Sequence, residues 1–346
     1  MNDINANALS SKLGDLACAG DLGGLAALMC QGADPRRGGS EALYMAAKHG
    51  HAECVRLHIP VSEAKSHNSR ALIFAAANGY AECAKLLIPV SKPKDSESAA
   101  LHAAAENGHV ECVKLLIPVS EPKDGESAAL RGAAKNGHAE CVKLLIPVSE
   151  PKDSESAALC MAAGNGHTEC VKLLIPASSP KADESAALRK AAYNGHPECV
   201  KLLAPASNPE AEDSYALRWA AYNGNFDSVQ LLMPLSDPTA SDSCALRWAV
   251  NNNHIDCVRV LIPNSLIKHH RVVASVLCHG DPEILSLMLA SDPLFLEDYD
   301  LADFLADAVS NGFPELAAML STIIEKAAIA AHLPLATASR AAALRI

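Results

Sequence analysis

A 29-residue block recurs eight times without a gap, and this repetition restricts the chain to folds built from stacked, nearly identical units. Each block carries an anchor leucine and, two helical turns later, a glycine or an asparagine. The anchors are Leu43, Leu72, Leu101, Leu130, Leu159, Leu188, Leu217 and Leu246, and the turn residues are Gly50, Gly79, Gly108, Gly137, Gly166, Gly195, Gly224 and Asn253. Eight units in one register exclude chance similarity.

Each block predicts two short helices, here called helix A and helix B. In the unit at 100–118, Leu101, Ala104 and Ala105 form one apolar stripe at helical spacing, which predicts helix A. Gly108 ends it, because glycine adopts a left-handed conformation without a steric penalty. A second stripe, which ends at Pro118, predicts helix B, and its members are Val113, Leu116 and Ile117.

The start of helix B has its own signature. His109 occupies the N-cap position, and Glu111 lies in the first turn, where the helix dipole favours an acidic side chain. In another unit Pro197 takes the first helical position, where its missing N–H costs nothing. Asn253 replaces the turn glycine once and is the next best residue for a left-handed conformation.

Less regular units flank the array. Gly280-Asp281-Pro282-Glu283 and Gly312-Phe313-Pro314-Glu315 repeat the turn and N-cap pattern after it, and Ala19-Gly20-Asp21 precedes it. The sequence therefore predicts about eleven helix pairs. We expect a capping repeat over 1–40, eight repeats over 41–263, and degenerate repeats with a cap over 264–346.

The Leu101–Ile117 string resembles the helix–turn–helix of ankyrin repeats, and Gln31-Gly32-Ala33-Asp34 is similar to the connecting loop of that family. The resemblance implies an all-α, ankyrin-like helical solenoid. The family period is about 33 residues, so the 29-residue unit implies a shortened connector, 118–125, with a tight proline-rich turn in place of a projecting hairpin. The resemblance also implies a non-enzymatic interaction module; bacterial members are often effectors delivered into the cytosol of a host cell.

Charge and hydropathy exclude several functions. The 29 basic and 40 acidic residues give a formal net charge of −11, which argues against binding to nucleic acid or to anionic lipid. No stretch approaches the roughly 18 apolar residues of a membrane span. The N-terminal segment, Met1 to Leu13, contains no apolar core of a secretory signal. We expect a monomer.

Apparent catalytic and metal motifs have structural explanations. His109-Val110-Glu111 resembles half of a zinc deaminase signature, but the Cys-x-x-Cys half is absent and similar strings recur through the repeats. The spacing of His269, His270, Cys278 and His279 matches no zinc pattern. The chain has no phosphate-binding loop and no nucleophile elbow. We therefore expect no cofactor, no metal and no catalytic residue.

Seven cysteines recur in helix B, namely Cys54, Cys83, Cys112, Cys141, Cys170, Cys199 and Cys257. Equivalent positions on stacked helices lie about 10 Å apart, whereas a disulfide needs Cα atoms within about 7 Å. These thiols are expected to be small buried core residues. They indicate a reducing, cytoplasmic compartment.

The positions that vary between repeats are the candidates for binding. Toward the C-terminal half, helix A gathers arginine, tyrosine and tryptophan, the residue types enriched at interface hot spots. The predicted stripe consists of Arg189, Lys190, Tyr193, Arg218, Trp219, Tyr222, Arg247 and Trp248. With the acidic residues expected in connectors and in helix B, this stripe would be a basic, aromatic patch. The alternative is that both tryptophans fill gaps between repeats while the arginines are solvated.

These observations favour a non-enzymatic scaffold that binds an acidic or extended segment of a partner protein through the helix A (concave) face. Two alternatives remain open. The C-terminal helices in 264–346 would recruit a second protein in an adaptor, or the same region would carry an enzymatic activity. The second alternative has the weaker basis, because this region shows no nucleophile paired with a base.

Overall fold

The computed structural model describes residues 2–62, 66–279, 281–297 and 299–332. This part of the chain contains 22 α-helices in eleven consecutive pairs, which confirms the expected number. They are α1 (Asn2–Ala19), α2 (Leu22–Cys30), α3 (Arg37–Lys48), α4 (Ala52–His58), α5 (Ser66–Ala77), α6 (Ala81–Leu87), α7 (Asp95–Glu106), α8 (Val110–Leu116), α9 (Asp124–Lys135), α10 (Ala139–Leu145), α11 (Asp153–Gly164), α12 (Thr168–Leu174), α13 (Ala182–Tyr193), α14 (Pro197–Leu203), α15 (Ala211–Tyr222), α16 (Phe226–Leu232), α17 (Ala240–Asn251), α18 (Ile255–Leu261), α19 (His270–His279), α20 (Pro282–Ser291), α21 (Leu301–Ser310) and α22 (Pro314–His332).

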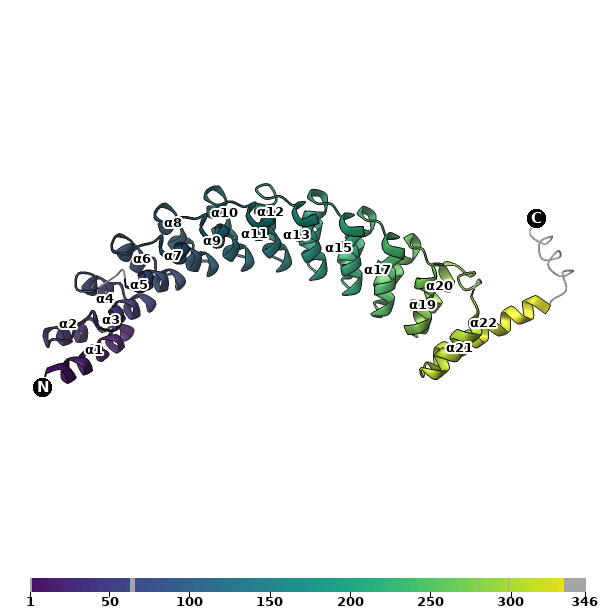
Figure 1. Ribbon diagram of the computed structural model, residues 1–346, viewed down its shortest axis with the longest axis horizontal. Coiled ribbons are helices and arrows are strands. Elements are labelled where there is room, and N and C mark those ends of the chain that lie inside the picture. The colour runs from purple at the N-terminus through teal and green to yellow at the C-terminus, as the bar shows by residue number, and fades with distance from the viewer. Residues whose placement is uncertain (1, 63–65, 280, 298, 333–346) are drawn as a thin grey trace. The chain divides into compact units, whose positions relative to one another are not determined.

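The chain divides into two compact units. The first comprises residues 1–191 and 198–208, and the second comprises 192–197 and 209–346. The division passes through the end of α13 and the start of α14. In the first unit the odd-numbered helices, which are the A helices, pack against one another in one layer, and the even-numbered B helices form a second layer (Figure 1). The second unit repeats this arrangement from α15 onward.

The core consists of the predicted stripes. Leu101, Ala104 and Ala105 of α7 are 0% exposed, as are Val113 and Leu116 of α8. Small side chains on helix A let neighbouring A helices approach closely, and leucines from both helices fill the remaining space. A single pair cannot bury both stripes, so each pair completes the core of the next.

The helix ends follow the predicted turn chemistry. Gly108 has φ +76° and Asn253 has φ +58°, so both adopt the left-handed conformation expected at the end of helix A. Helix α8 ends at Leu116, and a short 3-10 turn, Ile117–Val119, contains Pro118. The connector is thus a tight turn, and no β-strand occurs in the described residues. The expected turn at Gly280 lies outside them.

Helix A begins with a turn that the sequence analysis did not predict. Ser96, Glu97 and Ser98 have φ values of +52°, +55° and +56°, so three consecutive residues are left-handed before the right-handed helix continues. The same turn recurs at Gly125–Ser127, Ser154–Ser156, Asp183–Ser185, Glu212–Ser214 and Ser241–Ser243. A left-handed conformation costs roughly 1–2 kcal/mol for each L-residue with a side chain, so other contacts must stabilise this turn.

No helix in the described part of the chain is long and apolar enough to cross a membrane.

Candidate functional site

Five aromatic side chains meet on the helix A face of the second unit. The Trp219 ring centroid lies 5.1 Å from those of Tyr193 and Tyr222, 5.3 Å from that of Trp248 and 5.6 Å from that of Tyr215. The repeat explains this arrangement: Trp219 and Trp248 occupy the same position in consecutive units, while Tyr215 and Tyr222 each lie about one helical turn from Trp219 on α15. These five residues are called the Trp219 cluster below.

The Trp219 cluster combines half-buried and exposed rings. Tyr193 is 47% exposed and Tyr222 is 40% exposed, whereas Trp219 and Trp248 are half-buried. Trp219 Nε1 is buried and has no hydrogen-bond partner in the described structure. Trp219 therefore does pack between repeats, as the alternative interpretation held, and it also supports two tyrosines whose rings face solvent.

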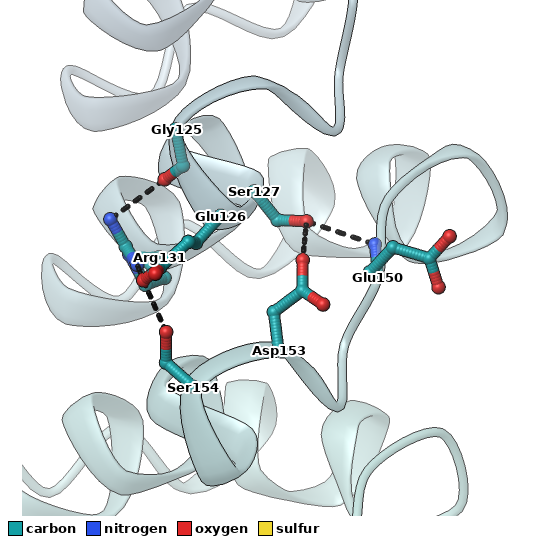
Figure 2. Close-up of polar contacts among 7 residues, drawn as sticks. All are labelled: Gly125, Glu126, Ser127, Arg131, Glu150, Asp153 and Ser154. Atoms are coloured by element: carbon teal, nitrogen blue, oxygen red, sulfur yellow. Dashed lines mark hydrogen bonds and ion pairs between the residues drawn. The ribbon is translucent and has the colours of Figure 1, made fainter.

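The arginines of the predicted stripe point toward the backbone. Arg218 Nη2 donates to the carbonyl oxygen of Glu212 at 2.6 Å, and Arg247 Nη2 donates to that of Ser241 at 3.0 Å. In the first unit Arg189 Nη2 donates to the carbonyl oxygen of Asp183 at 2.7 Å, and Arg131 Nη2 donates to that of Gly125 at 2.9 Å (Figure 2). Each acceptor belongs to the left-handed turn at the start of the same helix, so these arginines stabilise that turn.

This geometry corrects the expected charge of the stripe. The acidic side chains that the sequence analysis placed in connectors lie in the first turn of helix A, beside the arginines. Arg189 lies 3.3 Å from the Asp183 carboxylate and is only 18% exposed. Arg218 lies over the Tyr215 ring at 5.1 Å. Lys190 is exposed. The patch is therefore aromatic with compensated charge.

The eight predicted binding residues do not share one unit. Arg189 and Lys190 belong to the first unit, and the other six belong to the second. The structure brings Tyr193, Trp219, Tyr222 and Trp248 into contact, with Arg218 5.8 Å from the Trp248 ring.

The sequence analysis missed a buried serine that recurs once in each repeat. Ser127 Oγ accepts a hydrogen bond from the Glu150 N–H at 2.9 Å and donates one to Asp153 Oδ2 at 3.1 Å, which joins its left-handed turn to the next connector (Figure 2). The equivalent serines are Ser40, Ser69, Ser98, Ser156, Ser185, Ser214 and Ser243, none more than 2% exposed. Their constant spacing, equal to the repeat length, was the available signal.

A second aromatic cluster lies on helix A near the start of the array. Tyr44 and Phe74 stack with centroids 5.7 Å apart, and the Arg70 guanidinium lies 4.0 Å from the Tyr44 centroid. Lys48 Nζ is 5.8 Å from the Phe74 centroid. This cluster belongs to the first unit and shows that aromatic side chains occur on helix A in both units.

The histidines at the turn between helix A and helix B link neighbouring repeats. His109 is at the N-cap of α8, as predicted, but its side chain makes no hydrogen bond to that helix. Its Nε2–H donates to the Ala77 carbonyl oxygen of the preceding repeat at 2.9 Å. The ring also covers Gly79, where a Cβ would lie 2.5 Å from His109 Nδ1. These histidines therefore have a structural role, and the turn glycine is required for space as well as for conformation.

The repeated cysteines of helix B are buried core residues, as the sequence predicted. Burial raises the pKa of Cys112 and of Cys141 to about 11, so both thiols stay protonated at neutral pH. No group of three or more potential metal ligands occurs among the described side chains. His269 Nε2 lies 3.6 Å from Asp242 Oδ1, which makes it a neighbour of an acidic side chain.

The second unit also contains an apolar cavity of about 480 Å³ near the C-terminal helices. Aliphatic side chains from α20, the loop before α21, and α22 form most of its lining, with Glu297 and Tyr299 at its polar part. The aliphatic side chains include Leu289, Leu294, Leu296, Ile323 and Ile324. Leu294 is 55% exposed, so the cavity is accessible from the surface.

Comparisons with known proteins assign the family. The model of ankyrin repeats, built from three copies, matches residues 13–97, 89–153, 130–213 and 188–274, most of the chain. A solved structure, the human ASB11 ankyrin repeat domain, is similar with a TM-score of 0.45 at 20% identity, over 59% of this chain and 95% of that chain. A search of curated proteins finds no match. Ankyrin repeats generally mediate protein–protein interactions and are typically non-enzymatic. The chain belongs to the ankyrin-repeat family.

Proposed function

We propose that the protein is a non-enzymatic scaffold that binds an extended segment of a partner protein through the Trp219 cluster on the helix A face. The observation that carries this proposal is the pair of exposed tyrosine rings, Tyr193 and Tyr222, held on two half-buried tryptophans. Rigid aromatic side chains lose little conformational entropy on binding, and this makes them effective anchors.

The chemistry of this surface indicates which kind of partner segment fits it. Because Arg218 and Arg247 are hydrogen-bonded to backbone carbonyls and lie beside acidic turns, the surface offers aromatic contact area and little free positive charge. An extended segment with apolar side chains fits it better than a strongly acidic one. All twelve cysteines are free, which suits action in a reducing, cytoplasmic compartment. The proposal takes the protein to act there as a monomer.

The test uses the fact that both tryptophans of the chain lie in the Trp219 cluster. Partners are captured from lysate with the wild-type chain, and each is then titrated while the intrinsic tryptophan emission is followed. We expect a binding-dependent change in emission, and at least about tenfold weaker binding for Tyr222→Ala, which corresponds to about 1.4 kcal/mol.

The matched control is Tyr80→Ala, because Tyr80 is 37% exposed but precedes a B helix in the first unit. It should bind as the wild type does. Circular dichroism checks that each variant is folded. A partner that binds Tyr222→Ala and wild type equally would disprove binding at this cluster.

The cavity near the C-terminal helices favours a second candidate function, that of an adaptor. In this proposal the Trp219 cluster binds one protein and the apolar cavity binds another. Leu294→Glu places a charge at the cavity and leaves the helices intact, since Leu294 is 55% exposed. The adaptor predicts loss of one of two captured proteins, whereas a single-partner scaffold predicts an unchanged set.

A further inference from the structure

One connector position carries an acidic side chain in two neighbouring repeats and forms the same ion pair in both. Glu121 pairs with Lys94, and Glu150 pairs with Lys123. In each pair the lysine belongs to the preceding connector. The pairing raises the pKa of both lysines. These pairs connect successive connectors of the first unit.

Ser179 occupies this position in the next repeat, with the same backbone geometry. Its N–H donates to Ser156 Oγ at 2.9 Å, as the Glu121 N–H does to Ser98 Oγ and the Glu150 N–H does to Ser127 Oγ, both also at 2.9 Å. The Ala182 N–H donates to the Ser179 carbonyl oxygen at 2.9 Å, and the two earlier connectors close in the same way. Ser179 thus stands where an acidic group would continue the series by one repeat.

The lysine that should face this position is present. Lys152 is the counterpart of Lys94 and Lys123 in the connector that precedes Ser179. Its side chain is exposed and forms no ion pair within the described part of the chain. This repeat boundary therefore has the lysine but lacks an acidic side chain opposite it, as does the next boundary, where Lys181 is followed by Asn208 at the acidic position.

The sequence around Ser179 is unique in the chain. Ser179-Pro180 is the only place in the sequence where proline directly follows a serine or threonine, and Lys181 comes next. This pattern is the acceptor site of proline-directed protein kinases. Ser179 is half-buried in a surface connector between the exposed Pro176 and Lys181. Its hydroxyl makes no hydrogen bond to the residues that the structure describes, so the reacting oxygen has no hydrogen bond of its own to lose.

We propose that Ser179 is a phosphorylation site and that its phosphate pairs with Lys152. A proline-directed kinase supplies the reaction with a nucleoside triphosphate. Ser179 Oγ forms the new bond to the γ-phosphorus, the bond to the bridging oxygen breaks, the nucleoside diphosphate leaves and the hydroxyl proton passes to solvent. The product carries about −1.5 to −2 charges at pH 7. It extends the lysine–acid series by one repeat and adds an ion pair that depends on modification to the existing hydrogen bond between Ser179 and Ser156.

The first experiment tests whether the folded chain is a substrate. The full-length protein is incubated with ATP and a proline-directed kinase, and the modified residues are mapped by mass spectrometry. We expect one phosphate at Ser179 in the wild type and none at that position in Ser179→Ala or Pro180→Ala. No incorporation at Ser179 would overturn the proposal.

The second experiment tests the pairing and does not need the kinase, because phosphoserine is placed at position 179 genetically. The phosphorus NMR signal is titrated with pH in the wild-type background, in Lys152→Ala and in Lys123→Ala. A nearby cation favours the dianion, so the second phosphate pKa should rise by at least about 0.2 unit in Lys152→Ala. Lys123 pairs with Glu150 and serves as the matched control, for which no change is expected. Identical titrations in all three backgrounds would refute the pairing with Lys152.

Discussion

At the residue scale, the buried serine of each repeat has a constant spacing that the sequence shows, but its hydrogen-bond partner cannot be predicted from the sequence. Ser96 and Ser98 lie in the same turn of the same repeat, yet Ser96 is exposed and Ser98 is 2% exposed. The constant spacing of Ser98 and its counterparts indicates a structural role. Its hydrogen-bond donor, the Glu121 N–H, lies 23 residues later in the next connector. A contact of that range depends on how repeats stack, which local pattern does not determine.

Ser98→Ala should reduce the free energy of unfolding by about 1–3 kcal/mol, because it leaves the Glu121 N–H without its acceptor. Ser96→Ala is the matched control in the same turn and should change it by less than about 0.5 kcal/mol. Urea denaturation followed by circular dichroism measures both. Equal effects of the two substitutions would show that the buried hydroxyl does not stabilise the fold.

A buried histidine replaces the leucine that the repeat otherwise places in helix B. His58 is 0% exposed and occupies the helix B position that holds Leu87 in the next repeat. Its Nδ1–H donates to the Cys54 carbonyl oxygen at 2.9 Å, and its Nε2 has no partner in the described structure. Burial lowers the pKa of His58 from its ordinary value of 6.5.

The lowered pKa of His58 predicts acid sensitivity. Below about pH 6.5 the unfolded chain binds a proton at His58 while the folded chain does not, so the free energy of unfolding falls as the pH falls. His58→Leu removes this contribution and the unpartnered Nε2. The stability difference between His58→Leu and wild type should therefore widen from pH 8 to pH 5 in denaturation measurements. A difference that is constant with pH would contradict this explanation.

At the element scale, helix A is a right-handed helix that begins with a left-handed turn. The apolar stripe predicted the helical part, since Leu101 and Ala104 lie where the period requires. The turn escaped prediction because its residues, such as Ser154 and Glu155, are ordinary for a solvated connector or a helix start. The turn also accepts a hydrogen bond from Arg218 through the Glu212 carbonyl, so this arginine is not the free cation that the sequence analysis expected.

The left-handed turn predicts a stabilising glycine. Glu155 has φ +56° and an exposed side chain, so Glu155→Gly removes the steric cost of its Cβ. We expect the free energy of unfolding to rise by about 1 kcal/mol. Lys143→Gly is the control, because Lys143 is exposed within the right-handed helix α10, where glycine should destabilise by about 1 kcal/mol. Chemical denaturation measures the change in the free energy of unfolding for each variant, which should be positive for Glu155→Gly and negative for Lys143→Gly. Destabilisation by both variants would contradict the left-handed conformation of the turn.

The Trp219 cluster was predicted in composition and only partly in geometry. Trp219 and Trp248 share a position in the repeat, so their contact follows from stacking. The direction of Arg218 does not, because it depends on a carbonyl that only the left-handed turn presents. The aromatic part of the predicted stripe is therefore kept in our proposal, and the expected free positive charge is not.

At the scale of the whole molecule, the repeat pattern predicted about eleven helix pairs, eight of them regular, and the structure divides these pairs between two compact units. The periodic sequence continues across the division, so no signal in its spacing marks it. The predicted domain limits, 1–40, 41–263 and 264–346, stay a prediction. Because stability in a repeat array is roughly a sum over neighbouring interfaces, a local defect should have a local effect.

Hydrogen exchange tests this locality. Ser98→Ala weakens an interface in the first unit, so the amides of α7 and α9 should exchange faster than in the wild type. The amides of α17 in the second unit should keep their rates. Exchange is measured on the intact chain by mass spectrometry. Faster exchange throughout the molecule would mean that the array unfolds as one cooperative body.

The hydrogen bond from each connector to the buried serine has a consequence for how such a chain can evolve. Its donor is a backbone N–H, so the side chain at the donor position is irrelevant to the bond. That position holds Lys92, Glu121, Glu150, Ser179, Asn208, Asp237 and Leu266, with the bond kept at 2.7–2.9 Å throughout. Duplication can therefore copy a unit anywhere in the array with its joint intact, and later mutation can diversify the exposed side chain without penalty to folding.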